Sequence, residues 1–179
     1  SPNLNYTANT YYYKVDDLIT QVQSGDIKQW QNTSKRTGVG AEFDLDYSVG
    51  QRFRLSANYA YQRSKDDDSK KDVGDAPSHQ FYIRPEWRVD NMWIISPQLN
   101  WVGKQKRVPE ETLRTEDIGH YTTIDMTIKH INTANNLDVS ISIKNLFDRN
   151  YSTPAQNAGL IEGISNRDSE ILVRVIWNF

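Results

Sequence analysis

A two-residue alternation of apolar and polar side chains recurs along most of this chain, and it constrains the fold more than any other feature. Successive side chains of a β-strand point to opposite faces, so this alternation predicts strands with one apolar and one polar face. The alternating segments are residues 39–47, 53–61, 81–89, 93–101, 124–128, 137–143 and 171–179. An eighth strand is expected within residues 4–22, where the alternation does not identify the two faces.

The two faces of these strands differ sharply in charge. No charged residue occupies the apolar positions, whose non-hydrophobic members are Pro85 and Pro97. Because proline donates no ladder hydrogen bond, a bulge or an irregular pairing is expected there. The interleaved positions carry Glu42, Asp44, Asp46, Arg54, Arg84, Glu86, Arg88, Asp125, Asp138 and Arg174.

The connections between these strands alternate in length. Residues 48–51, 90–91 and 132–136 are short and polar, whereas 23–37, 63–78, 103–120 and 148–169 are long. This alternation predicts an antiparallel up-and-down meander with its short turns at one end. No helical pattern, linker or domain boundary interrupts it.

A soluble sheet and a membrane-spanning barrel both have one apolar and one polar face. The chain is only 37% hydrophobic and contains no apolar run long enough for a transmembrane helix. Two clusters of aromatic side chains near the strand ends, with the asymmetric loops, favour a transmembrane β-barrel whose apolar face meets lipid. The clusters are Tyr47, Phe53, Trp87, Trp93, Trp177 and Phe179 toward the short turns, and Tyr61, Phe81, Trp101, Tyr121 and Phe147 toward the long loops.

Several function classes find no support in the sequence. The net charge of −2 gives no basic footprint for nucleic acid, and the absence of cysteine excludes disulfides and thiolate metal sites. His79, His120 and His130 lack the spacing of metal ligands, and the charged run 65–72 is interpreted as a solvated loop. No catalytic motif is present, so we expect neither an enzyme nor a bound cofactor or metal.

The sequence offers two sets of candidate functional residues. Long loops on a rigid scaffold commonly carry binding residues, and an anionic or aromatic ligand such as a metal chelate would suit cationic and aromatic side chains. The candidate ligand contacts are Trp30, Arg107, Arg114, Tyr151 and Arg167. A charge network that wets the lumen or docks a plug is expected from Glu42, Asp44, Asp46, Arg54, Arg84, Glu86 and Arg88.

Residues 145–151 read NLFDRNY, which resembles the signature that closes the penultimate strand of TonB-dependent outer-membrane receptors. Four segments that precede this signature occur in the order that this family shows over its last strands. They are residues 11–19, 38–42, 55–61 and 76–79. The resemblance covers nearly the whole chain. Where the family often has Pro-Gly-Arg before its last strand, this chain has Ser165, Asn166, Arg167 and Asp168, which leaves the subfamily open.

The resemblance implies that residues 1–179 form the C-terminal segment, of about eight strands, of a larger 22-stranded barrel without its plug domain. It implies a Gram-negative outer-membrane transporter that captures a scarce nutrient, most often an iron–siderophore complex. Its partners would be outer-membrane lipid, its own N-terminal plug, the TonB energy-transducing complex acting through the plug, and the barrel-assembly machinery. That machinery would read a terminal signal at Val175, Trp177 and Phe179.

Two competing classes stay open at this point. One is a self-contained eight-stranded outer-membrane barrel with a structural or adhesive role, and the other is a soluble lipocalin-like binder. A self-contained barrel requires the first strand to pair with the last, whereas a segment of a larger barrel leaves both as edges.

Overall fold

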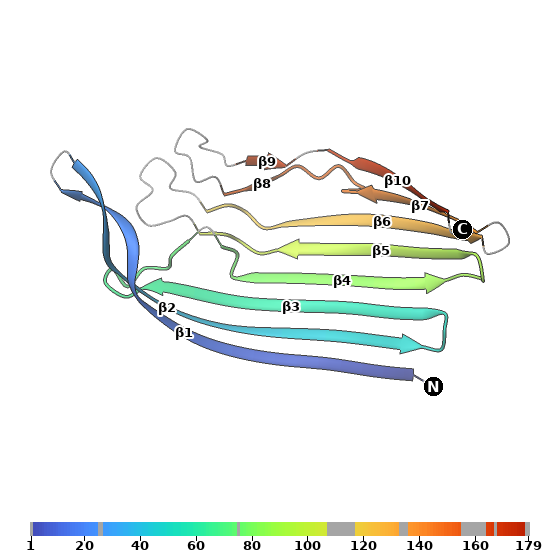
Figure 1. Cartoon of the computed structure of the whole chain (residues 1–179), viewed down its shortest axis with the longest axis horizontal. Helices are drawn as coiled ribbons and strands as arrows, with labels where there is room; N and C mark the ends of the chain where they lie inside the picture. The colour runs from blue at the N-terminus through green and yellow to red at the C-terminus, as the bar shows by residue number, and fades with distance from the viewer. Residues whose placement is uncertain are drawn as a thin grey trace.

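A computed structural model describes residues 2–24, 27–74, 76–106, 117–132, 136–154, 164–166 and 168–177. These residues form a curved antiparallel sheet with a small hairpin at one end (Figure 1). No helix of the described ranges is long and apolar enough to cross a membrane. The strands are β1 (Pro2–Ser24), β2 (Ile27–Val49), β3 (Phe53–Asp66), β4 (His79–Arg88), β5 (Trp93–Val102), β6 (Tyr121–Asn132), β7 (Leu137–Lys144), β8 (Tyr151–Thr153), β9 (Ile164–Asn166) and β10 (Glu170–Trp177).

The main sheet has eight strands in the order β1-β2-β3-β4-β5-β6-β7-β10, all paired antiparallel. The all-β, up-and-down meander predicted from the sequence is therefore confirmed. Three connections differ from the prediction. Residues 27–37 and 63–66 are strand rather than loop, and the long connection before the last strand contains the separate β8–β9 hairpin.

The β1–β2 hairpin is much longer than a membrane crossing requires. Each of its strands has 23 residues, against about 9–11 for a tilted transmembrane strand. The register shifts between Val15 and Ile19, and Asp17 there has a φ of 58°. Figure 1 shows the distal part of this hairpin bending away from the sheet. The additional residues therefore extend the wall beyond the apolar band.

The strand register brings the apolar positions together on one face. One continuous row runs across Leu45, Ala57, Ile83, Leu99 and Ile124. A second row joins β5, β6, β7 and β10 through Ile95, Ile128, Ile141 and Val173. The register also resolves the faces of β1, since its even-numbered residues, such as Tyr6 opposite Leu45, join the apolar face.

This apolar face is not covered by protein. Ile118 is the one buried hydrophobic residue of the described part of the chain. By contrast, Tyr6 is 70% exposed, Trp177 67% and Val173 61%. A lipocalin-like fold would enclose such a face, so the structure contradicts the soluble-binder alternative. The face is instead suited to lipid.

The two prolines of the apolar face lie opposite each other. The register on both sides of them is the same, since Ile83 pairs with Leu99 and Trp87 with Ile95, and this places Pro85 opposite Pro97. Ladder pairing between β4 and β5 is interrupted here without a bulge, while each proline remains paired to its other neighbour, Pro85 to β3 and Pro97 to β6. The two backbone N–H donors that the prolines lack are thus both missing from the β4–β5 pair, which makes this pairing irregular. The buried Ser96 Oγ donates to the Pro85 carbonyl at 3.2 Å and supplies one bond in their place.

Two glycines of β2 let tyrosine rings lie flat against the polar face. Gly40 is opposite Tyr11 and Gly38 is opposite Tyr13. A Cβ added at Gly40 would lie 2.2 Å from the Tyr11 ring, and one at Gly38 would lie 2.3 Å from the Tyr13 ring. The aromatic rings thus occupy the space that the glycine side chains leave, which pins the register of this pair.

The sheet is open at β1 and β10. No pairing joins these two strands among the described residues, so the requirement for a self-contained eight-stranded barrel is not met. An unpaired strand edge is not tolerated in lipid, because each backbone N–H and C=O there needs a partner. The arrangement is that of a wall segment of a larger barrel.

The face assignment predicts a difference between neighbouring residues of β7. Ile141 is on the apolar face between Ile128 and Val173, and Ser142 is on the polar face opposite Thr127. In the parent protein, Ile141→Arg is expected to lower the free energy of unfolding in a bilayer by about 2–4 kcal/mol. Ser142→Arg, as the matched control, should cost much less. Urea titration in lipid vesicles measures both, and equal costs would contradict the assignment.

Candidate functional site

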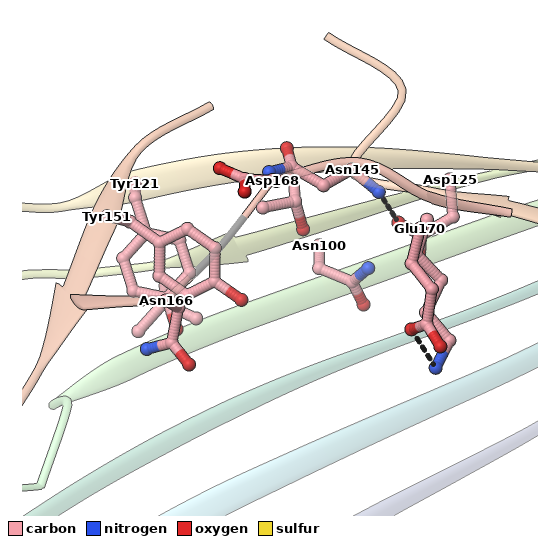
Figure 2. Close-up of a pocket in the computed structure, with 11 residues that line it drawn as sticks. Asn100, Tyr121, Asp125, Asn145, Tyr151, Asn166, Asp168 and Glu170 are labelled. Carbon is pink, nitrogen blue, oxygen red and sulfur yellow. Dashed lines mark hydrogen bonds and ion pairs between the residues drawn. The ribbon is translucent and has the colours of Figure 1, made fainter. Parts of the chain in front are cut away.

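A polar hollow of about 400 Å³ lies at the long-loop end of the polar face (Figure 2). Its walls come from β5, β6 and β7, from the β8–β9 hairpin, and from the start of β10. It is lined by Asn100, Val102, Tyr121, Thr123, Asp125, Lys144, Asn145, Tyr151, Asn166, Asp168 and Glu170.

The turn that follows β7 organises one side of this hollow. Asn145 is buried, has a φ of 47°, and lies at the centre of the turn. Its amide group bonds both backbone groups of Arg149: Nδ2 donates to the carbonyl at 3.0 Å, and Oδ1 accepts from the N–H at 2.9 Å. Asparagine suits this position because it tolerates the left-handed conformation and provides both a donor and an acceptor.

The same turn joins three strands of the main sheet. The Asn145 N–H donates to Asp125 Oδ1 on β6 at 2.8 Å, and Leu146 N–H donates to the Ile124 carbonyl at 2.7 Å. Ser169, immediately before β10, donates from Oγ to the Asn145 carbonyl at 2.9 Å and from N–H to Asp148 Oδ1 at 3.2 Å. The NLFD segment thus sets where β10 begins beside β7.

Two tyrosines form the aromatic side of the hollow. The rings of Tyr121 and Tyr151 stack with centroids 4.1 Å apart and an interplanar angle of 22°. Figure 2 shows them beside Asn166, which donates to Thr153 Oγ1 at 3.1 Å within the β8–β9 hairpin. Tyr121 therefore belongs to the polar face, and its predicted place in the outward aromatic cluster was wrong, because the register of β6 directs odd-numbered residues to the polar side.

The hollow is rich in oxygen atoms and carries charges of both signs. Lys144 pairs with Glu170 at 3.3 Å, and the Asp125 carboxylate is occupied by the Asn145 N–H. No described group of His, Asp and Glu residues is arranged to hold a metal ion. The arrangement can receive a polar molecule of moderate size through hydrogen bonds and ring stacking.

Four of the seven residues of the predicted charge network form two separate ion pairs on the polar face. Asp46 accepts from Arg54 at 3.2 Å and from Ser56 Oγ at 2.7 Å. Arg84 donates to Glu86 at 3.5 Å and to Ser96 Oγ at 3.1 Å.

Three further members of that set lie on the same face without joining either part. Glu42, Asp44 and Arg88 form no ion pair with the residues that the structure describes. A row of polar side chains therefore runs along β2, β3 and β4, with charges available to a molecule or domain that enters the lumen side.

A second cluster joins the loop after β3 to the segment after β5. The Asp72 carboxylate accepts from Arg63 Nε at 2.9 Å and from Lys106 Nζ. The bond from Arg63, followed by that from Lys106, lowers the pKa of Asp72 from 3.8 to about 2. Isolated bridges from Gln105 to Pro77 and to Ile118 bring the two loops together.

The predicted ligand contacts have different outcomes. Tyr151 lines the hollow, whereas Trp30 lies near the distal end of the β1–β2 hairpin, is 70% exposed, and does not line it. Arg107, Arg114 and Arg167 fall outside the described residues, as does Phe179 of the predicted assembly signal. Val175 and Trp177 are exposed on the apolar face of β10.

Sequence reasoning missed most of the hollow. Asn100, Asp125 and Asn166 come from three different elements, and no spacing in the sequence indicates that they converge. The NLFD signature was the available signal, because its Asn145 marks the turn that brings these elements together.

We compared the chain with known protein families and solved structures. The family "TonB dependent receptor-like, beta-barrel" matches residues 1–146. No curated protein matches the sequence.

Several solved structures share the fold at low sequence identity. The pyoverdine outer-membrane receptor FpvA from Pseudomonas aeruginosa PAO1, bound to pyoverdine, has a TM-score of 0.80 and 15% identity, with 98% of this chain and 27% of that chain covered. The siderophore receptor PiuA from Acinetobacter baumannii has a TM-score of 0.69 and 20% identity, with 96% and 26% covered. The copper transporter OprC has a TM-score of 0.77 and 15% identity, with 96% and 28% covered. The chain thus spans about a quarter of the length of these structures.

The Asn145 turn predicts that alanine substitution changes the stability of the protein differently at two nearby asparagines. Asn145→Ala removes two side-chain hydrogen bonds and places alanine at a positive φ, so it should destabilise the parent protein by about 1–3 kcal/mol. Asn150→Ala, at an exposed position, is the control and should be near neutral. Denaturant titration in detergent compares them, and equal stabilities would refute the role of Asn145.

The Asp72 cluster predicts that the mobility of the loop after β3 depends on pH. Because the folded pKa of Asp72 is depressed to about 2, the contact is fully present above the ordinary value of 3.8 and is lost as pH falls through about 2. A spin label at position 70 should therefore become more mobile only over that acidic range. Asp72→Asn should give the mobile spectrum at pH 7, whereas Asp68→Asn at the exposed loop tip should not. An unchanged spectrum in Asp72→Asn would contradict the prediction.

Proposed function

This chain belongs to the TonB-dependent receptor family of outer-membrane β-barrels, and on that premise we propose that residues 1–179 are the C-terminal barrel segment of a receptor for energy-dependent nutrient uptake. The proposed cargo is an iron–siderophore complex. The segment supplies barrel wall, lumen lining and loops on the extracellular side. Its role is binding and transport rather than catalysis.

The proposal rests on two features that occur together: an apolar face that no protein covers, and a polar hollow at the long-loop end. Long loops of outer-membrane barrels are extracellular, so the hollow opens where a ligand arrives from outside the cell. Tyr121 and Tyr151 offer a stacked aromatic wall, and Asn100, Asn166 and Thr123 offer hydrogen-bonding groups. A chelate carries polar atoms around its metal together with planar groups, and both find partners here.

The solved structures add support for the cargo. One of them is a pyoverdine receptor with pyoverdine bound, another is a siderophore receptor, and a third is a copper transporter. A metal chelate is therefore the ligand class that best fits both the fold and the hollow.

The polar face has a further proposed role in holding a plug. Glu42, Asp44 and Arg88 present charges without an ion-pair partner among the described residues, and the Asp46–Arg54 and Arg84–Glu86 pairs are more than one-third exposed. Exposed pairs exchange partners at small cost. We place the protein's own plug domain against this face, with the TonB complex acting on the plug.

The end of the chain has a proposed role in assembly. Val175 and Trp177 lie on the outward face of β10, opposite Val139 and Leu137. With Phe179 they would present alternating apolar side chains to the barrel-assembly machinery. The strand edge of β10 remains available for pairing during that process.

The uptake proposal predicts a specific loss of ligand affinity. In the parent receptor, Tyr151→Ala removes the stacked ring from the hollow and should weaken binding of a ferric siderophore about tenfold, as measured by quenching of tryptophan fluorescence. Tyr12→Ala is the matched control, because Tyr12 is 66% exposed on the opposite, apolar face. Ferric pyoverdine, a ferric catecholate and a copper chelate serve as probes.

The experiment separates three outcomes. Weaker binding of an iron chelate in Tyr151→Ala alone supports the proposal. Binding of the copper chelate alone would replace iron with copper as the cargo. Equal affinity of Tyr151→Ala and the unmodified receptor for every bound chelate would overturn the assignment of the hollow.

A further inference from the structure

The charged side chains of the polar hollow are mainly acidic. The described lining carries three carboxylates and one ammonium group, at Asp125, Asp168, Glu170 and Lys144. Lys144 Nζ lies 3.3 Å from a Glu170 carboxylate oxygen, so the charges of these two residues offset each other. Asp125 and Asp168 remain as a surplus of two negative charges. A hollow lined by charges of one sign attracts ligand groups of the other sign.

The two surplus carboxylates form no ion pair within the part of the chain that the structure describes. Asp125 is half-buried, and its Oδ1 accepts the Asn145 N–H at 2.8 Å. A carboxylate has two oxygens and accepts several hydrogen bonds, so Asp125 keeps acceptor capacity for a ligand. Asp168 is exposed. The two residues therefore provide an inner and an outer negative charge.

The strand geometry of β6 defines the order of groups inside the hollow. Tyr121, Thr123 and Asp125 alternate along this strand, so they lie on the same face and progressively farther from the long loops. Because a strand rises about 3.3 Å per residue, Asp125 lies roughly 13 Å below Tyr121 along the strand. Asn100 is opposite Thr123, and Figure 2 shows its side chain between the tyrosine pair and Glu170. The hollow thus passes from an aromatic rim through neutral polar groups to a carboxylate.

Each of these levels suits a cation. The faces of aromatic rings attract a positive charge within about 6 Å of the ring centre, and the stacked Tyr121 and Tyr151 rings form the rim. An ammonium group donates three hydrogen bonds and accepts none. Asn100 Oδ1, Thr123 Oγ1 and the Asp125 carboxylate are all acceptors. An anionic group would meet like charge here instead.

On the premise of the uptake function proposed above, we propose that the hollow binds a positively charged ammonium group of the cargo. Asp125 is the inner contact and Asp168 the outer one. The cargo is then a ferric chelate with an alkylammonium arm, rather than an anionic chelate. A bare metal ion does not fit, since no described group of His, Asp and Glu residues is arranged to hold one.

The test compares two chelates that differ in a single charge. Ferrioxamine B is a linear ferric trihydroxamate that ends in an ammonium group, and its N-acetyl derivative has the same iron centre without that charge. Binding to the parent receptor in detergent is measured by isothermal titration calorimetry. Ferrioxamine B should bind about tenfold more tightly at low ionic strength. The difference should shrink in about 0.5 M sodium chloride, because salt screens the attraction.

Two variants test the carboxylates separately. Asp125→Asn keeps an oxygen that accepts the Asn145 N–H, and Asp168→Asn alters an exposed side chain. Each should lower the preference for ferrioxamine B over its N-acetyl derivative about threefold, with little change for the derivative itself. Asp168→Glu should retain the preference. Asp68→Asn, on the exposed loop after β3, is the matched control and should behave as the unmodified receptor does.

The outcomes separate this inference from the uptake function. Equal affinity of the unmodified receptor for the two trihydroxamates would overturn the inference and leave uptake standing, as would an unchanged preference in both aspartate variants. Binding of an anionic ferric tris-catecholate without binding of ferrioxamine B would do the same. Failure of every chelate to bind would overturn the uptake function and the inference together. Because the preference is a ratio within each variant, a general loss of folded protein does not change it.

Discussion

Backbone hydrogen bonding across the strands is the constraint on which the rest of this structure depends. In hydrocarbon no water is available to an unpaired N–H or C=O, so each strand must be paired along its apolar band. The ladder continues from β1 to β10. Among the described pairs it is interrupted where Pro85 faces Pro97 and, in the long β1–β2 hairpin, where the register shifts between Val15 and Ile19. At the proline pair, the buried Ser96 hydroxyl bonds the Pro85 carbonyl. The structure has almost no buried apolar core because its apolar side chains are directed to lipid instead.

The same register separates the functions of the two faces. Rows of aliphatic side chains occupy the outward face, while the Asp46–Arg54 and Arg84–Glu86 pairs occupy the other. Beyond the membrane-spanning part of the strands, individual polar contacts rather than strand pairing hold the turns and loops in place. Asn145 fixes the turn between β7 and β10, and Asp72 joins two loops. The polar hollow lies in this zone, where loops that carry binding residues are held by a rigid scaffold.

The sequence was sufficient to predict most of the sheet. The alternation identified β3 to β7 and β10, because a side-chain period of two is a direct consequence of strand geometry. It did not reveal that residues 27–37 continue β2, since that stretch lacks an apolar face and is held by pairing with β1.

The site was less predictable. Tyr151 was identified as a loop aromatic, but Asn100, Asp125 and Asn166 converge only through the packing of the β8–β9 hairpin over the sheet.

The central claim is that the odd-numbered residues of β7 meet lipid while the even-numbered ones face the lumen. Spin labels placed in turn at Val139, Ser140, Ile141, Ser142 and Ile143 in the membrane-embedded receptor test it most directly. The account predicts that labels at 139, 141 and 143 are relaxed by lipid-soluble oxygen, and that labels at 140 and 142 are relaxed by a water-soluble nickel chelate. Relaxation of all five positions by the nickel chelate, or an alternation of the opposite phase, would contradict it.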